Sequence, residues 1–119
     1  MQCPFSGSVY VIVGPGTFSA AADFAHAVKD LRIATIVGEE TGGVRRALGD
    51  TPGFATPNSG IRFWVSTKLF YPPISRPDDD VRGTVPDFPI DDEKLAPFLG
   101  AADPEIACTL DLARKDRGE

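Results

Sequence analysis

The sequence contains little histidine and cysteine. Its 119 residues include one histidine, His26, and two cysteines, Cys3 and Cys108, which lie far apart. Structural zinc sites and disulfide frameworks both need several such residues at short spacings. The sequence therefore predicts no metal site, no other cofactor and no disulfide framework. A single Cys3–Cys108 bridge is geometrically conceivable, and the sequence leaves it open.

Basic residues and long apolar runs are also scarce. Twelve Lys and Arg stand against 17 Asp and Glu, for a formal net charge of -5, and no basic run exceeds two residues. This balance disfavours nucleic acid or an anionic membrane as partner. No apolar stretch approaches the roughly 20 residues that span a bilayer. Residues 1–4 also lack the basic and apolar regions of a signal peptide. The length and apolar content suit a single domain over residues 1–119 with a buried core.

A strand–helix–strand unit is predicted over residues 8–38. Residues 8–13 and 33–37 are short β-branched runs that predict buried strands, and residues 18–32 predict a helix between them. The apolar face of this helix is expected to hold Ala21, Phe24, Ala25, Val28 and Leu31. The opposite, polar stripe is expected to hold Asp23, His26 and Asp30. Two apolar strands joined in this way predict a parallel pair.

The remaining sequence is rich in glycine and proline. Residues 61–67 alternate in polarity, which predicts a strand with two differently solvated faces. Residues 77–80 are an acidic turn, and residues 84–90 are extended because of their prolines. Residues 91–99 and 103–115 predict two short helices.

Ser19 stands at the mouth of the predicted helix, after the glycine turn at residues 14–16. Backbone N–H groups in a first helical turn lack intrahelical partners, so they can stabilise the oxyanion formed when a serine attacks a carbonyl. Serine and threonine are also preferred helix caps. A capping role for Thr17 or Ser19 is therefore the alternative to a nucleophilic one.

Several segments in collinear order resemble one family. Residues 9–13, 17–25 and 32–43 look like the tail-specific (carboxyl-terminal processing) serine peptidases, an S41-like group. Two later matches are Pro57-Asn58-Ser59-Gly60 and Gly83-Thr84-Val85-Pro86-Asp87, which resembles the family's "glycine, x, hydrophobic, Pro, Asp" signature. The resemblance implies an α/β fold of the crotonase/ClpP-like spiral type, with a mostly parallel sheet. It also implies a serine endopeptidase with a polypeptide substrate.

The resemblance further implies that Ser19 is the nucleophile and that the Ala20 backbone N–H is an oxyanion donor. One branch of the family uses a lysine base shortly after its "Gly-Glu-x-Thr" turn. This chain has Val44, Arg45 and Arg46 there, and arginine cannot act as a base because it stays protonated. A lysine dyad is therefore disfavoured. Lys68, on a predicted strand, is expected to be solvated.

A second branch resembles the tricorn core protease and uses an upstream histidine with a glutamate shortly before the Pro-Asp signature. The matching position is Asp80, six residues before Pro86, which implies that Asp80 orients the histidine. A solvated turn at residues 78–80 is the alternative. His26 is disfavoured as the base, because seven residues along a helix from Ser19 is about 10.5 Å.

The family's catalytic domain begins well before the position that matches Met1. The resemblance therefore implies that residues 1–119 are the carboxyl-terminal part of a larger catalytic domain and are inactive alone. The missing amino-terminal part would supply the histidine and a second oxyanion donor, and it would cover exposed apolar surface; homo-oligomer formation is a further expectation. A non-catalytic ligand-binding or protein-interaction module of the same fold is the alternative function. Family members commonly work outside the cytoplasm of bacteria, in the periplasm or secreted.

Overall fold

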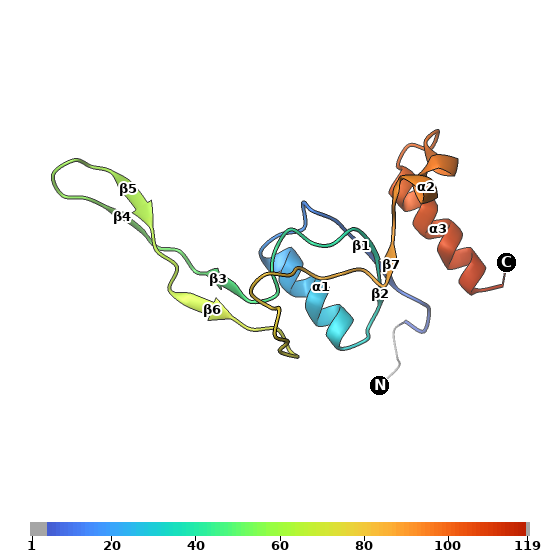
Figure 1. Ribbon diagram of the computed structural model, residues 1–119, viewed down its shortest axis with the longest axis horizontal. Helices are drawn as coiled ribbons and strands as arrows, with labels where there is room; N and C mark the ends of the chain where they lie inside the picture. The colour runs from blue at the N-terminus through green and yellow to red at the C-terminus, as the bar shows by residue number, and fades with distance from the viewer. Residues whose placement is uncertain (1–4, 119) are drawn as a thin grey trace.

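The computed structural model describes residues 5–118, which form a central body, a long hairpin arm and a carboxyl-terminal helical part (Figure 1). The elements in chain order are β1 (Tyr10–Val13), α1 (Ala20–Asp30), β2 (Thr35–Gly38), β3 (Ala47–Gly49), β4 (Gly53–Ala55), β5 (Arg62–Trp64), β6 (Lys68–Phe70), β7 (Phe88–Pro89), α2 (Asp92–Leu95), the 3₁₀ turn η1 (Ala96–Phe98) and α3 (Pro104–Asp116). The fold is mixed α/β.

The central sheet has three parallel strands in the order β1-β2-β7. The helix α1 connects β1 to β2, so the predicted strand–helix–strand unit is confirmed. The adjacent β2 residues Ile36 and Val37 are both fully buried, on opposite faces. Ile36 packs with Val28 of α1, and Val37 packs with Cys108 of α3. Because helices cover both faces, the strands are apolar throughout.

The carboxyl-terminal segment confirms the two predicted helical regions. Asp91 accepts a hydrogen bond from Lys94 N at the start of α2, and Asp103 accepts one from Ile106 N at the start of α3. These carboxylates satisfy backbone donors that a helix start leaves free. Cys108 is a buried free thiol. The conceivable Cys3–Cys108 bridge involves Cys3, which lies outside the described residues.

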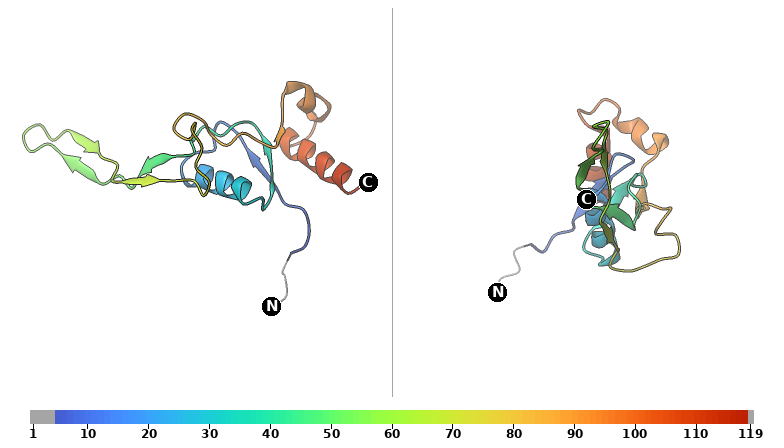
Figure 2. Two further views of the ribbon diagram at one scale, coloured as in Figure 1. Left: turned by 60° about the horizontal axis from the view of Figure 1, so that its bottom comes forward. Right: turned by 90° about the vertical axis from the view of Figure 1, so that its left-hand side faces the viewer.

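The hairpin arm consists of two consecutive antiparallel ladders, β3 with β6 and β4 with β5. It projects away from the body (Figure 2), so the molecule measures 66 × 41 × 30 Å. The Cα radius of gyration is 18.5 Å, against about 13.5 Å for a compact domain of this length. The strand predicted at residues 61–67 is confirmed only for residues 62–64, which form β5, and its predicted difference between two faces is wrong because all three residues are exposed. No other described segment covers either face there.

The predicted faces of α1 are partly wrong. Ala25 and Val28 are buried as predicted, but Ala21 is exposed, and Phe24 and Leu31 are 57% and 59% exposed. His26 is buried instead, and the Asp30 carboxylate is fully buried in ion pairs. The sequence pattern assigns charged residues to water because an unpaired buried charge is costly. Arginines from distant segments remove that cost for Asp30.

Candidate active site

Ser19 has a backbone conformation that is rare for a residue with a side chain. Its φ is 52° and its ψ is -133°, at the boundary between the glycine turn and α1. Such a conformation costs of order 1–3 kcal/mol and is found preferentially at functional sites. The Ser19 side chain is exposed and makes no capping hydrogen bond to α1. Thr17 Oγ1 instead accepts from Gly14 N at 3.1 Å within the turn. The helix-cap interpretation is therefore wrong for both residues.

The loop at residues 38–43 packs directly behind the serine turn. Gly43 N donates to Thr17 O at 3.0 Å. A Cβ on Gly43 would lie 2.7 Å from Ala22 Cβ and 3.4 Å from Ser19 N. Any side chain at Gly43 would therefore displace the turn that holds Ser19. The loop thus supports the turn that carries Ser19.

The same loop is fastened to the Gly83–Asp87 segment. The Thr41 hydroxyl accepts from Thr84 N at 2.8 Å in a buried position. Both oxygens of Glu40 accept from Arg82 at 2.8 Å, and one also accepts from Gly83 N at 2.9 Å. The Arg82 hydrogen bonds lower the pKa of Glu40. Two of the segments that carry the family resemblance therefore bind each other.

Asp87, the last residue of that segment, ties it to the sheet. Its carboxylate accepts from Ile36 N at 2.9 Å and from Lys29 Nζ at 2.7 Å. Partial burial opposes ionisation of Asp87, but the hydrogen bonds from Lys29 and the Ile36 amide outweigh it and lower the pKa of Asp87. Through Asp87, the Gly83–Asp87 segment is therefore attached to the start of β2 and to α1.

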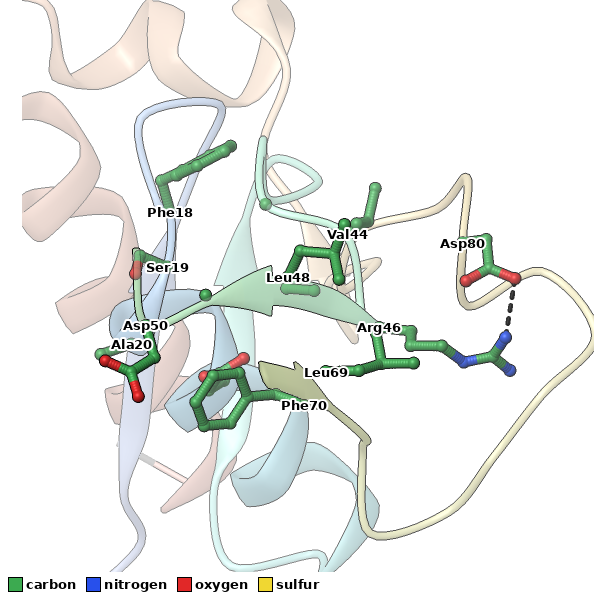
Figure 3. A pocket seen from close by; sticks show the side chains of 14 residues that line it. Phe18, Ser19, Ala20, Val44, Arg46, Leu48, Asp50, Leu69, Phe70 and Asp80 are labelled. Carbon is green, nitrogen blue, oxygen red and sulfur yellow. Dashed lines mark hydrogen bonds and ion pairs between the residues drawn. The ribbon is translucent and has the colours of Figure 1, made fainter. Parts of the chain in front are cut away.

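A pocket of about 780 Å³ lies beside Ser19 (Figure 3). One wall comes from the serine turn and α1, and the other from the segment that leads into the hairpin arm and from the root of the arm. The lining residues are Phe18, Ser19, Ala20, Asp23, Gly43, Val44, Arg46, Ala47, Leu48, Gly49, Asp50, Leu69, Phe70 and Asp80. The Ala20 N–H, in the first turn of α1, has no acceptor among residues 5–118. It is a free donor next to the serine.

Asp80 lines the same pocket, so the three sequence-predicted site residues border one cavity. In Figure 3, Ser19 and Asp80 lie at opposite ends of it. Asp80 Oδ2 accepts from Arg46 Nη1 at 2.8 Å, and Arg46 also lies over the Tyr71 ring, 5.4 Å from its centroid. Within the described part of the chain, Asp80 Oδ1 has no partner. One oxygen of this carboxylate is thus held and the other is free.

His26 and Lys68 are both away from Ser19. His26 is buried outside the pocket, with Nε2 3.9 Å from Asp23 Oδ1 and Nδ1 without a hydrogen-bond partner. Burial, and then the Arg45 charge, lower the pKa of His26. Lys68 is exposed on the arm and pairs with Asp50 at 2.7 Å. The solvated position predicted for Lys68 is confirmed, and neither residue is placed to deprotonate Ser19.

Comparison with known protein families identifies the family of the chain. The model of peptidase family S41 matches residues 2–90. The chain belongs to this family. No curated protein sequence matches it significantly. Membership in the S41 family supports a serine-peptidase function, and the matched segment includes both the Ser19 turn and the Gly83–Asp87 motif.

This S41 member also contains a buried ionic cluster that the sequence analysis missed. Arg45 donates from Nε to Asp79 at 2.8 Å and from Nη2 to Asp30 at 2.7 Å. Arg76 binds the other oxygen of Asp30 at 2.9 Å. The predicted solvated turn at residues 78–80 is therefore wrong for Asp79, which is fully buried. The only sequence signal was the density of charge at residues 76–80.

Among residues 5–118 no three His, Cys, Asp or Glu side chains gather in a way that would hold a metal ion. In the same part of the chain, no helix has the length and apolar character needed to cross a bilayer.

Proposed function

We propose that this S41-family protein is a serine endopeptidase in which Ser19 is the nucleophile. The observation that carries the proposal is the positive φ of Ser19 at the mouth of α1, with its hydroxyl exposed beside a pocket and not used as a cap. A sharp strand-to-helix turn of this kind presents a serine hydroxyl to substrate. Residues held in sparsely populated backbone conformations cluster at active sites, which supports a catalytic role for Ser19.

In the proposed reaction, Ser19 Oγ bonds to the carbonyl carbon of a peptide, and its proton passes to a general base. The Ala20 N–H donates to the oxyanion, assisted by the positive end of the α1 dipole. The C–N bond then breaks, and the base returns the proton to the departing amine. Water hydrolyses the resulting ester by the same steps in reverse, which releases the acid and regenerates the serine.

The proposed base is a histidine from polypeptide outside the described residues, as in the tricorn-core-like branch. Support comes from the buried, distant position of His26 and from Val44, Arg45 and Arg46 in the segment where the other branch has its lysine. Asp80 would orient that histidine through its free Oδ1 while Arg46 holds Oδ2.

Three finer assignments accompany this proposal. The three-stranded parallel sheet would be part of a crotonase/ClpP-like spiral. Residues 1–119 would be the carboxyl-terminal part of the catalytic domain and inactive alone, with the remaining part packing against the exposed apolar surface at α1. The biological reaction would be carboxyl-terminal, tail-specific processing of polypeptides.

A non-catalytic binding module of the same fold is the second candidate. It is favoured by one observation: no described histidine or lysine lies at the Ser19 pocket, whose lining is largely apolar. A fluorophosphonate, which reacts with activated serines, distinguishes the two candidates.

The experiment uses the full-length protein, its Ser19→Ala variant and a matched Ser75→Ala control, because Ser75 is exposed and does not line the pocket. We expect fluorophosphonate labelling and cleavage of an unfolded protein in the wild type and Ser75→Ala, and neither in Ser19→Ala. Absence of both signals in the folded wild-type protein would reject the peptidase and favour the binding module. Residues 1–119 assayed alone should be inactive.

A further inference from the structure

The root of the hairpin arm, formed by β3 and β6, lines one wall of the Ser19 pocket. Four consecutive residues, 47–50, line the pocket, together with Leu69 and Phe70 of β6. Successive side chains of a strand point to opposite faces. All three residues of β3, Ala47, Leu48 and Gly49, line the pocket, and Asp50 follows directly after the strand. The pocket therefore contacts the backbone of β3 as well as side chains on both of its faces.

β3 has one open edge. Among the described residues β3 pairs with β6 alone, in a two-stranded ladder. One side of β3 therefore carries backbone groups without a strand partner. An unpaired edge accepts an extended polypeptide as an added strand, with main-chain hydrogen bonds giving affinity and side-chain pockets giving selectivity.

The charged groups around the pocket are mostly neutralised in pairs. Asp80 binds Arg46, and Asp50 binds Lys68 at 2.7 Å. Asp23 is the remaining carboxylate at the pocket. The rest of the lining is mainly apolar and comes from Phe18, Val44, Leu48, Leu69 and Phe70. Such a lining accommodates an apolar side chain and disfavours an acidic one.

Leu48 is the most exposed large apolar residue of this lining, at 71%. It lies at the centre of β3, opposite Leu69 in the ladder. Its exposure means that it adds little to the core, so a substitution there changes the pocket more than the fold.

We propose that an extended polypeptide substrate docks along the free edge of β3 and inserts an apolar side chain against Leu48, which brings its backbone to Ser19. The inference rests on the proposed peptidase function and adds the strand on which the substrate docks and the residue that selects its side chain. The scissile carbonyl then lies between the strand edge and the Ser19–Ala20 turn, on the facing wall of the pocket.

The first test compares Leu48→Glu with Ile61→Glu in the full-length protein. Ile61 is the control because it is 63% exposed on the same arm and does not line the Ser19 pocket. Matched peptides carry Leu, Lys or Glu at one position beside the cleaved bond. In the wild type, kcat/KM should be at least about tenfold higher for Leu than for Glu, since pocket contacts of this size discriminate by 10- to 200-fold. Leu48→Glu should lose the preference for Leu and gain relative activity on Lys, whereas Ile61→Glu should behave as wild type.

Fluorophosphonate labelling, measured on the same samples, separates the two proposals. Wild-type protein that is not labelled overturns the peptidase function itself. Labelled Leu48→Glu protein with an unchanged Leu-to-Lys ratio overturns the role of Leu48 and leaves the nucleophile standing. If Leu48→Glu does not fold, Leu48→Ala decides the question, because a larger pocket should shift the preference to bulkier side chains.

A second test addresses the docking of the backbone. The best peptide is remade with an N-methyl group at each successive residue, which removes one main-chain donor at a time. Pairing with one strand edge uses alternate residues, so kcat/KM should fall at every second position. Uniform tolerance along the peptide would overturn the strand-edge docking.

Discussion

Arg45 Nε lies 2.8 Å from Asp79 Oδ1, and both side chains are buried. The two residues fix the segment before β3 against the turn that carries Asp80. Backbone hydrogen bonds reinforce the contact, from Arg46 N to Asp79 O at 2.9 Å and from Arg45 N to Arg82 O at 3.0 Å. Asp30 joins the same guanidinium to the end of α1. The cluster therefore determines where the far wall of the Ser19 pocket lies.

Replacing Arg45 with methionine should destabilise the protein strongly. The variant leaves the carboxylates of Asp30 and Asp79 buried without their main cation, and breaking such a pair costs about 3–5 kcal/mol. Urea unfolding measures the loss. Lys115→Met is the control, because its pair with Asp111 is on the surface of α3 and its removal should leave the midpoint almost unchanged. Equal midpoints for the two variants would show that the buried cluster adds no stability.

Stability should fall as the pH decreases from 7 to 5 because of His26. Burial lowers the pKa of His26 in the folded state, so the unfolded chain binds a proton first, near its ordinary value of about 6.5. A group that is more easily protonated when unfolded favours unfolding as protons are added. His26→Gln should flatten this part of the stability curve. Urea midpoints at several pH values measure both slopes, and an unchanged slope would contradict the assignment.

Below about pH 4 a second loss of stability should follow, from Asp87 and Asp79. Burial raises and hydrogen bonds lower the pKa of each, with a net lowering. A carboxylate whose pKa is lowered in the folded state stabilises the protein at every pH above its pKa in the unfolded chain, near 3.9. This contribution is lost as the pH falls through the folded-state pKa. Asp87→Asn should make the acid limb shallower. An acid limb as steep as in the wild type would exclude Asp87 as a contributor.

Local sequence patterns predicted the elements whose partners are near in the sequence. The unit at residues 8–38 has a strand, a helix and a strand in register, and Asp103 caps the helix that follows it directly. These features depend on periodicity and on contacts three or four residues apart, which the sequence displays.

The errors concern contacts between distant residues. Arg45 is 15 residues from Asp30 and 34 from Asp79, so no local pattern indicated that these charges are buried together. Phe24 and Leu31 have helical spacing with the core residues, yet nothing described covers them. At the site, the positions of Ser19, Ala20 and Asp80 came from the family resemblance, whereas the positive φ of Ser19 and the Arg46–Asp80 ion pair needed coordinates.

Ser19→Gly should be more stable than Ser19→Ala, although both should be inactive. Glycine adopts the observed φ of 52° without the steric conflict that a Cβ creates, whereas alanine keeps the strain. We expect a difference of about 1 kcal/mol in the free energy of unfolding, measured by urea titration. If alanine is as stable as glycine, the turn around Ser19 is relaxed and the strain argument for a nucleophile fails.

Asp80→Asn separates the orienting role from simple ion pairing. If Asp80 orients a catalytic histidine, the amide stabilises the wrong tautomer, and kcat should fall by a factor of about 10⁴ with little change in KM. Arg46→Met breaks the same 2.8 Å contact from the other side but leaves the carboxylate, so its kcat should fall much less. Steady-state kinetics of both variants in the full-length protein, with the pH profile of kcat/KM, provide the measurement. Equal, small effects on kcat in the two variants would show that Asp80 is only an ion-pair partner of Arg46. An orienting carboxylate contacts the histidine directly, so its loss alone should change kcat and the pH profile.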